Sequence, residues 1–315
     1  MRRMEFETRA IHGGQEPDPA TGARTDVSRE PLDLRHDGLE RSVGAYLVET
    51  PDGLALFDCG PATTFETLRE ELHARGVEFA DLRHLLLSHI HLDHAGAAGL
   101  VARANPALTV HVSAIGAPHV VDPSRLEASA RRLYGETFDT LFGALIPVPE
   151  ERVHIVSDRV AGLDCFPTPG HAAHHVSYLH PDGTLYAGDA AGVRVAPARF
   201  VLPPLPPPEV DLDAWRETFA AIRARRPERL ACIHFGVFAD VEAHLDRLEA
   251  TIARWSGWVA GGADEAKFAV AAHADIAASD PESADHYLSV VPSWHAFRGL
   301  DRYHRKLREA VAAAP

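Results

Sequence analysis

The chain of 315 residues contains almost no lysine and few cysteines. Lys267 and Lys306 are the two lysines, and 31 Lys and Arg against 45 Asp and Glu give a formal net charge of -14. Such a composition argues against a nucleic-acid surface, which needs clustered basic side chains to displace counterions. Cys59, Cys165 and Cys232 are far apart and form no CxxC pair, which argues against a disulfide framework and fits a reducing compartment.

Long hydrophobic runs are also missing. No apolar run reaches the roughly 20 residues that a membrane-spanning helix needs. The start, MRRMEFETRA, lacks the apolar middle region of a secretory signal. We therefore expect a cytoplasmic protein with no membrane partner. The composition leaves the oligomeric state open, a homo-oligomer included.

Histidine, in contrast, is abundant, with 20 copies against 13 Phe and 6 Tyr. Three of these histidines and one aspartate lie in the stretch SHIHLDHAG, residues 88–96, directly after the apolar run 85–87. A strand that ends in a loop can turn such side chains toward one point. Imidazole and carboxylate groups are ligands that suit Zn, Fe or Mn. The stretch therefore predicts a metal site, for which other segments must supply further ligands.

Short apolar runs separated by turn signals predict interleaved strands and helices. Two hairpins are expected at residues 43–60 and 175–189, each around a Pro-Asp-Gly turn. The expected helices cover residues 64–75, 96–104, 123–134 and 211–226. The other expected strands cover residues 84–88, 108–113, 152–157, 163–168 and 229–235. This pattern predicts an α/β protein with stacked sheets flanked by helices.

The chain divides into three predicted regions. Residues 1–30 are polar and aperiodic and are expected to form a loosely ordered lead-in. Residues 31–240 are predicted to form the metal-binding domain. Residues 241–315 are predicted to be a helical extension, because they carry too little apolar bulk for a core of their own.

A segment of the lead-in has a separate resemblance. FETRAIHGGQEPDPATGA, residues 6–23, resembles the amino end of cystathionine γ-synthase-type enzymes, which use pyridoxal phosphate. The Schiff-base lysine of that family would have to be Lys267 or Lys306, and neither lies in a matching context. We therefore carry over no catalytic residue.

Three later segments each end an apolar run with a ligand-type residue: TPGH, AGD and IHFG. Together with the first stretch they give seven candidate metal ligands: His89, His91, Asp93, His94, His171, Asp189 and His234. Seven ligands are enough for two metal ions that share one carboxylate. A single four-coordinate structural zinc would leave three of them unexplained and would lack its usual sulfur ligands.

These motifs resemble those of the metallo-β-lactamase superfamily over roughly residues 40–240. HIHLDH matches the HxHxDH signature of that family, TPGH, AGD and IHFG follow in the family's order, and LFDCG resembles its early aspartate motif. The resemblance implies a four-layer αβ/βα sandwich, here followed by the helical extension. It also implies the roles of eight residues: a first metal held by His89, His91 and His171, a second held by Asp93, His94 and His234, Asp189 as the bridge, and Asp58 as a structural residue.

The predicted chemistry follows from two ions roughly 3.5–4 Å apart, which activate a water and polarise the substrate oxygen. A metal-bound hydroxide would be the nucleophile. Asp93 is the candidate catalytic residue, because a ligand that also accepts a hydrogen bond can orient the hydroxide and move its proton. We therefore predict a binuclear hydrolase of the glyoxalase II or lactonase kind. It would use two divalent ions, Zn in the first place with Fe or Mn as alternatives, to cleave a small acyl substrate: an ester, thioester, lactone or amide.

Three alternatives stay open: an iron-dependent oxidoreductase similar to sulfur dioxygenases, a phosphodiesterase, and a non-catalytic binding protein. His234 counts against a mononuclear dioxygenase, and the complete ligand set counts against loss of catalysis. The basic residues near the ligand loops are isolated, namely Arg83, Arg125 and Arg194, which favours an acyl substrate over a phosphodiester. The tyrosine that some acyl-homoserine lactonases place after the bridging aspartate is replaced here by alanine, so the substrate stays open.

Residues 111–135 follow the strand after the metal motif and are predicted to contact the substrate. His119, Arg125 and Tyr134 are the candidate substrate-binding residues, suited to a carboxylate or a carbonyl group. The alternative is a capped helix with a solvated Arg face and a packed Tyr.

For two further groups of residues, position along the chain predicts less specific roles. His175 follows a predicted ligand and is expected to hydrogen-bond the groups around the metals, whereas His174 stays undecided. Trp294, Tyr303 and His304 would either form a lid or anchor the terminal helix.

Overall fold

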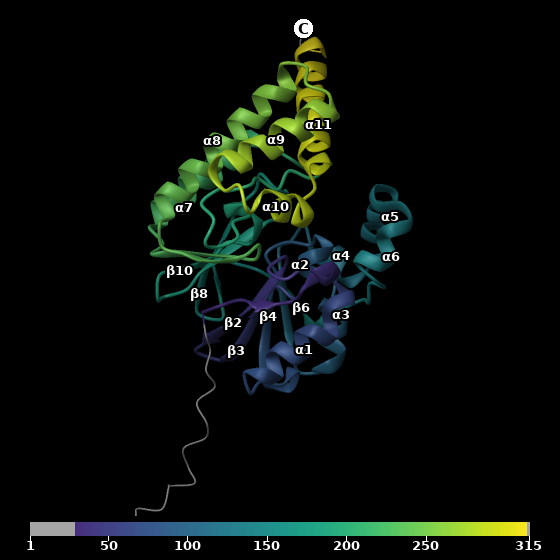
Figure 1. The fold of residues 1–315 in the computed structure, drawn as a ribbon. Coiled ribbons are helices and arrows are strands. Elements are labelled where there is room, and N and C mark those ends of the chain that lie inside the picture. The colour runs from purple at the N-terminus through teal and green to yellow at the C-terminus, as the bar shows by residue number, and fades with distance from the viewer. Residues whose placement is uncertain (1–28, 314–315) are drawn as a thin grey trace, which may run out of the picture.

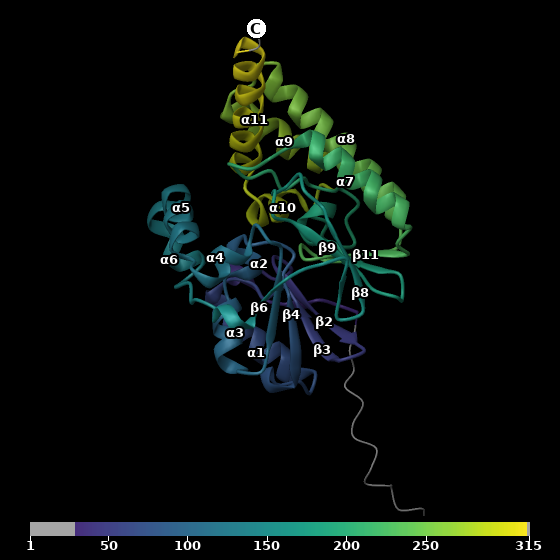
Figure 2. The same cartoon turned by 180° about the vertical axis from the view of Figure 1, so that it is seen from behind.

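The computed structural model describes residues 29–313. The segment 6–23, and with it the resemblance to cystathionine γ-synthase-type enzymes, lies outside the described residues. Two six-stranded sheets lie face to face below a group of long helices (Figures 1 and 2). This architecture is the predicted mixed α/β sandwich with a helical carboxyl-terminal region.

The first sheet is built from the amino-terminal half of the chain, in the order β1-β2-β3-β4-β5-β6. Its strands are β1 Leu32–Asp33, β2 Gly44–Thr50, β3 Gly53–Phe57, β4 Leu82–Leu86, β5 Thr109–Val112 and β6 Val153–Ile155. Strands β1 to β3 are antiparallel, and β3 to β6 run parallel with helices in the connections. The predicted hairpin at residues 43–60 is therefore confirmed as β2 and β3.

The second sheet has the order β12-β11-β10-β9-β8-β7. Its strands are β7 Arg159–Val160, β8 Leu163–Pro167, β9 Val176–Leu179, β10 Thr184–Tyr186, β11 Arg229–Cys232 and β12 Gly236–Phe238. Strands β9 and β10 form the second predicted hairpin, and β10 runs parallel to β11. Parallel pairing requires a crossover between these two strands, and the chain makes it through the proline-rich segment 201–210 and a helix.

Aromatic side chains fill the space between the two sheets. The ring of Phe57 lies 5.8 Å from that of Tyr178 and 5.4 Å from that of Tyr186, both on the opposite sheet. Tyr46 is fully buried, and its hydroxyl donates to the carbonyl oxygen of Cys232 at 2.7 Å. These contacts fix the two sheets relative to each other, and thereby the loops at their ends.

Helices cover the outer faces of the sheets. The α-helices are α1 Phe65–Ala74, α2 Leu92–Ala95, α3 Ala98–Ala104, α4 Ala117–Val121, α5 Ser124–Tyr134, α6 Phe138–Leu141, α7 Leu212–Arg225, α8 Val241–Ala260, α9 Glu265–Ser279, α10 Ala284–Val290 and α11 Ser293–Ala313. The 3-10 turns are η1 His36–Gly38, η2 Ala62–Thr64, η3 Phe79–Asp81, η4 Gly135–Thr137, η5 Glu150–Arg152 and η6 Gly188–Ala191. Both ribbon views show α5 and α6 projecting to one side of the sheets (Figures 1 and 2).

The carboxyl-terminal helices pack on the second sheet. Leu248 and Trp255 of α8, Tyr287 of α10 and Leu300 of α11 belong to one apolar cluster with Leu230 of β11. The hydroxyl of Tyr287 also donates to the carbonyl oxygen of Phe200 at 2.7 Å. Whether a domain boundary lies at residue 241 stays a prediction.

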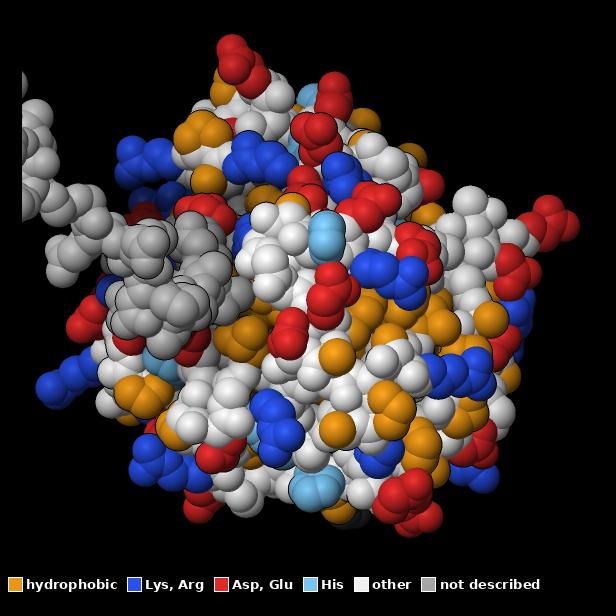
Figure 3. Space-filling view, turned by 90° about the horizontal axis from the view of Figure 1, so that it is seen from below, with side chains coloured by type: hydrophobic (Ala, Val, Ile, Leu, Met, Phe, Trp, Pro, Cys, Tyr) orange, Lys and Arg blue, Asp and Glu red, His pale blue; other side chains and the backbone are white. Residues whose placement is uncertain are grey.

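Among residues 29–313, no helix combines the length and the apolar content that crossing a bilayer requires. On the face that Figure 3 shows, basic side chains are scattered between acidic and hydrophobic ones. This face carries no continuous basic stripe.

Candidate metal centre

The seven predicted ligands come from both sheets, at the ends of strands. The buried strand β4 is followed by residues 88–91 and then by α2, which begins with Leu92 and carries Asp93 and His94. The second sheet supplies His171 from the β8–β9 connection, Asp189 from η6 after β10, and His234 directly after β11. The structure brings all seven side chains to one place, while the metal that each would bind stays a prediction.

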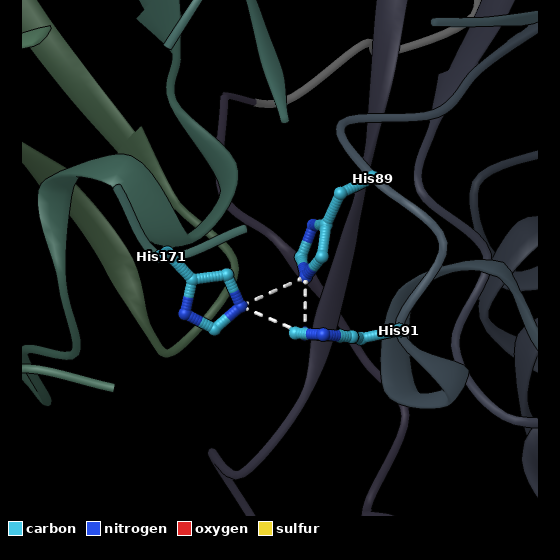
Figure 4. A group of neighbouring side chains, drawn as sticks. All are labelled: His89, His91 and His171. Carbon is cyan, nitrogen blue, oxygen red and sulfur yellow. Dashed lines mark hydrogen bonds between the residues drawn. The ribbon is translucent and has the colours of Figure 1, made fainter. Parts of the chain in front are cut away.

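Three imidazoles form the first ligand group (Figure 4). His91 Nδ1 lies 3.0 Å from His89 Nε2 and 2.7 Å from His171 Nε2, and the two Nε2 atoms are 3.2 Å apart. Three nitrogen atoms from two sheets thus converge on one point. These atoms are spaced as ligands of a single ion would be, since zinc binds histidine nitrogen at about 2.0–2.1 Å.

Two carboxylates and two imidazoles form the second ligand group. Asp93 Oδ2 lies 3.6 Å from His94 Nε2 and 3.5 Å from His234 Nε2. Asp189 lies between the two groups, because its Oδ1 is 3.3 Å from His94 Nε2 while its Oδ2 is 3.3 Å from His171 Nε2. One carboxylate therefore faces both groups, as a bridging ligand would.

In four of the five ligand imidazoles, those of His89, His94, His171 and His234, the protein holds the Nδ1 atom that points away from the ligand group. Nδ1 of His171 donates to the carbonyl oxygen of Pro204 at 2.8 Å, and Nδ1 of His234 donates to that of Ser42 at 2.6 Å. The hydroxyl of Ser88 accepts from His89 Nδ1 at 2.9 Å. A proton on Nδ1 leaves the lone pair on Nε2, directed at the ligand group. The contact between the Nε2 atoms of His89 and His171 consequently joins two lone pairs, and a cation would bind there.

Asp58 lies behind the ligands and is completely buried. Its Oδ1 accepts from the backbone N–H of Ser88 at 2.7 Å, and its Oδ2 accepts from the Ser88 hydroxyl at 2.7 Å and from His94 Nδ1 at 2.8 Å. Burial raises the pKa of the Asp58 carboxyl, and the bonds from His94 and Ser88 oppose this shift. The structural role that the resemblance implied for Asp58 stays a prediction.

Two buried atoms of the centre have no hydrogen-bond partner within the described residues. These are His94 Nε2 and Asp189 Oδ1. A buried polar atom without a hydrogen-bond partner costs about 1–3 kcal/mol. Such atoms are therefore rare in folded proteins unless a ligand supplies the missing partner. Together with the nitrogen-rich donor set, this observation shows that the residues fit divalent metal ions.

The charges of the centre also differ between its groups. Burial lowers the pKa of His89 and of His91, so both imidazoles are neutral, as ligands must be. Burial opposes ionisation of Asp189, but the nearby His94, His171 and His234 hold its pKa well below the usual range. Burial also opposes a charge on His94 and His234, but the Asp189 carboxylate raises the pKa of both imidazoles. The bridge is therefore ionised.

The two histidines after His171 have different surroundings. His175 is buried, accepts from the backbone N–H of Asp189 at 3.1 Å through Nε2 and contacts the Thr168 hydroxyl at 2.8 Å through Nδ1. It therefore contacts the turn that carries Asp189, while its predicted role around bound metals stays a prediction. His174 Nε2 lies 3.5 Å from Glu209, and burial lowers the pKa of this imidazole to about 3.

A cavity of about 490 Å³ opens above the ligands. His119, Arg125 and Tyr134, the three predicted substrate contacts, all line it together with Asp93 and other ligands. Burial and the Asp93 charge raise the pKa of the Tyr134 hydroxyl, which therefore stays protonated and able to donate a hydrogen bond. Whether these residues contact a substrate stays a prediction.

Sequence reasoning missed several residues of the cavity wall. These are Arg132 of α5, Arg302 and His295 of α11, and Glu209 within the proline-rich segment. The sequence offered a signal for Arg132, because a residue seven positions after Arg125 lies on the same helix face. It offered none for the α11 residues, which follow the last ligand by about sixty positions.

The basic residues near the site also differ from the prediction. Arg194 is buried, pairs with Asp240 at 2.6 Å and does not line the cavity. Arg83 is exposed on β4 and does not line it either. Of the three arginines singled out from the sequence, Arg125 alone lines the cavity, where it is accompanied by Arg132 and Arg302.

His295 is unusual among these residues. Its Nε2 atom is buried without a hydrogen-bond partner in residues 29–313, and its ring lies 5.8 Å from that of Tyr134. Burial lowers the pKa of His295 to about 4, against an opposing effect of Asp93. A neutral imidazole thus faces the cavity from the carboxyl-terminal helix.

The other residues considered as a lid lie in two places. The ring of Trp294 is 6.1 Å from that of Tyr134. His304 bonds Ser256 of α8 at 2.9 Å, and the hydroxyl of Tyr303 donates to Asp213 at 3.4 Å. Tyr303 and His304 therefore anchor α11, whereas Trp294 belongs to the surroundings of the cavity.

Two mixed sheets covered by helices, with a group of His and Asp side chains at their strand ends, define a metal-binding α/β sandwich protein. The family model described as "Metallo-beta-lactamase superfamily" matches residues 39–234, more than half of the chain. The chain belongs to the metallo-β-lactamase superfamily.

Individual relatives are distant. The chain is similar to the uncharacterized protein YobT of Bacillus subtilis, with 27% identity over 156 residues that cover 48% of this chain and 63% of the relative. It is 33% identical to ribonuclease Z of Bradyrhizobium diazoefficiens over 140 residues, 41% of this chain and 40% of the relative. The matches span less than two thirds of either relative. Among solved structures, the metallo-beta-lactamase family protein TTHA1429 of Thermus thermophilus superimposes with a TM-score of 0.60 at 21% identity, covering 84% of this chain and 89% of the other.

Proposed function

We propose that the protein is a binuclear metal-dependent hydrolase that cleaves a small acyl substrate: an ester, thioester, lactone or amide. The observation that carries this proposal is the position of Asp189, whose two carboxylate oxygens face two separate ligand groups. When bound, two divalent ions would supply an activated water and polarise the oxygen of the scissile bond. The nitrogen-rich ligand set favours zinc.

The side chains of the chain prepare this site for hydrolysis. His89, His171 and His234 are held with Nε2 directed inward by bonds from their Nδ1 atoms, so the ligand geometry is fixed before any ion binds. Fixed ligands reduce the reorganisation that the reaction would otherwise require.

Asp93 is the proposed proton carrier. Burial opposes its ionisation, but His94 and His234 hold the pKa of its carboxyl below the usual range, so it is a carboxylate at neutral pH. It is the more exposed of the two carboxylates and lines the cavity. From there it accepts the proton of the attacking water and passes it to the leaving group.

The direct test combines metal analysis with a hydrolysis panel. Protein purified without added metal is analysed for elements, and we expect about two transition-metal ions per chain. The metal-loaded protein is then given aryl esters, lactones, glutathione thioesters, a β-lactam and a bis-aryl phosphodiester. We expect turnover of an acyl compound. Less than one ion per chain, unresponsive to Zn or Mn, contradicts the binuclear site.

A second candidate function is phosphodiester hydrolysis. The similarity to ribonuclease Z and the presence of Arg132 and Arg302 beside Arg125 favour it. Faster turnover of the bis-aryl phosphodiester than of every acyl compound in the same panel would replace the acyl assignment. Visible absorption from bound iron would instead support the oxidoreductase alternative.

A further inference from the structure

The cavity has an apolar side formed largely by α5. Leu126, Ala130 and Leu133 follow one another at intervals of four and three residues, so they share one face of the helix, and all three line the cavity. None of the residues of α5 is fully buried. Ile115, before α4, lines the same cavity and leaves 56% of its surface exposed. Apolar side chains that stay accessible above a reactive centre suit an apolar part of a ligand.

Three arginines lie around this apolar surface. Arg125 and Arg132 are both exposed and lie two turns apart on the cavity face of α5, about 10.5 Å along the helix axis. Arg302 of α11 lines the cavity from another element, and its Nε donates to the carbonyl oxygen of Pro208 at 3.3 Å. We call the part of the cavity lined by Arg125, Arg132 and Arg302 its mouth.

None of these three guanidinium groups forms a salt bridge with a carboxylate within residues 29–313, although Arg125 lies near enough to Asp122 to contribute, after hydrogen bonds from Ser124, to the lowered pKa of that carboxyl. Arg131, on the same helix but away from the cavity, shows the contrast, because it pairs with Glu127 at 2.8 Å and Asp139 at 2.7 Å. Other arginines of the described residues are also paired with carboxylates at the surface, as Arg131 is.

Glu209 is the acidic residue of the mouth, and it is engaged elsewhere. Its Oε2 accepts from the backbone N–H of Ala173 at 3.3 Å and lies 3.5 Å from His174 Nε2. The mouth therefore carries an excess of positive charge on a chain with a net charge of -14. An anion near the mouth would find unpaired, bidentate donors.

We propose that the cavity binds an acyl compound that carries an anionic group at the end remote from the scissile bond. This inference rests on the proposed hydrolase function and deepens it. The scissile carbonyl lies at the ligand groups, the apolar spacer packs on Leu126 and Leu133, and the anion pairs with Arg125 and Arg132, with Arg302 opposite them.

A small molecule fits these observations better than RNA does. The arginines line a cavity of about 490 Å³, a volume in the range of small-molecule sites. Binding of RNA by charge requires contacts to several successive phosphates.

Two probes of equal length test the inference without turnover. Suberamate carries an amide at one end and a carboxylate at the other, and octanamide lacks the carboxylate. Their affinities for the metal-loaded full chain are measured by calorimetry at low and high salt. We expect suberamate to bind about tenfold more tightly than octanamide at low salt, as a charge-assisted bidentate contact implies, and to lose this advantage at high salt.

Variants locate the effect. Arg125→Gln with Arg132→Gln should lower suberamate affinity about tenfold and leave octanamide affinity unchanged. Arg131→Gln is the matched control, since it removes one positive charge from the same helix outside the cavity, and it should change neither affinity. Equal binding of the two probes, or an unchanged suberamate preference in the double variant, overturns the inference.

The kinetic arm separates this inference from the proposed function. The mono-p-nitrophenyl ester of suberic acid is compared with p-nitrophenyl octanoate, and we expect a higher kcat/KM for the anionic ester in the wild type but not in the double variant. Hydrolysis of both esters without this preference keeps the function and overturns the anion subsite. If suberamate binding depends on the arginines but neither ester is hydrolysed, the anion subsite is supported and the proposed hydrolase function is contradicted. Displacement of suberamate by a single-stranded oligoribonucleotide that is itself cleaved overturns the small-molecule assignment.

Discussion

The floor and the wall of the cavity are built in different ways. The floor, formed by the seven ligand residues and Asp58, is mostly buried, and the protein holds four of its five imidazoles by a second bond. The wall, formed by α5, the proline-rich segment, α10 and α11, presents exposed arginines and a histidine without a partner. The family model ends at residue 234, before α10 and α11 begin. We infer that the floor determines the reaction and that the wall determines the substrate.

Removing the charge of the bridge should have the largest effect. Asp189→Asn keeps the size of the side chain but removes the negative charge that offsets repulsion between two cations. We expect it to reduce metal content and to lower kcat/KM more than about 100-fold, beyond the 10–100-fold typical of residues behind the ligands. Elemental analysis and kinetics measure both. Asp182→Asn, in the β9–β10 turn, is the control, and full activity of Asp189→Asn would refute the bridging role.

Removing the Asp58 carboxylate behind the ligands should lower the free energy of unfolding before it affects activity. Asp58→Ala leaves His94 Nδ1 and the Ser88 N–H buried without their acceptor. Removing one partner of a buried pair costs about 3–5 kcal/mol, so we expect a fall of that order in the free energy of unfolding. Urea unfolding of the wild type, Asp58→Ala and Asp58→Asn measures it. The Asn variant retains an acceptor and should lose less; equal losses would show that shape rather than hydrogen bonding matters here.

Changing the wall should alter substrate affinity and leave the metals in place. His295→Phe keeps an aromatic ring in the cavity wall but removes the buried Nε2 nitrogen, which has no hydrogen-bond partner among residues 29–313. We expect KM to rise about tenfold, the worth of one hydrogen bond to a substrate, with metal content unchanged. His304→Phe on the same helix, which anchors α11 away from the cavity, should leave KM unchanged. A loss of metal in His295→Phe would place this residue in the floor instead.

The smallest effect concerns His244 of α8, which contacts the turn that carries the bridging Asp189. Its Nε2 donates to the carbonyl oxygen of Ala191, two residues after the bridge, at 2.7 Å. Burial lowers the pKa of His244 to about 4, and the facing charges are Arg194, Asp240 and Arg247.

A histidine with a depressed pKa stabilises the fold at high pH. As the pH falls below about 6.5, the unfolded chain takes up a proton that the folded chain refuses until about pH 4, so stability is lost across this window. The loss should be about 1–3 kcal/mol. Unfolding of the wild type and of His244→Gln, which keeps a donor but does not titrate, is compared at pH 7 and pH 4.5. Identical pH dependence of the two proteins would exclude His244 as the cause.

The sequence predicted the floor better than the wall, for a physical reason. His89 and Asp189 directly follow apolar strands, so local spacing was sufficient to place them at one edge of the sheets. His295 and Arg302 reach the cavity because α10 and α11 pack on the second sheet, for example through Tyr287. Such packing depends on contacts between residues distant in the chain, which no local pattern encodes. The same cause explains why the sequence did not predict the positive charge that Arg302 adds to the cavity.

The distribution of the ligands over two sheets has a consequence for the mechanics of the chain. A shared ion at His89 and His171 would cross-link positions 82 residues apart, and all three cysteines are free and buried. Closing a loop of this length removes conformational entropy from the unfolded chain, as a disulfide does. The ions would thus act as reversible cross-links between the two sheets. Chelation should therefore speed hydrogen exchange along β4 and β11 well before the outer helices respond.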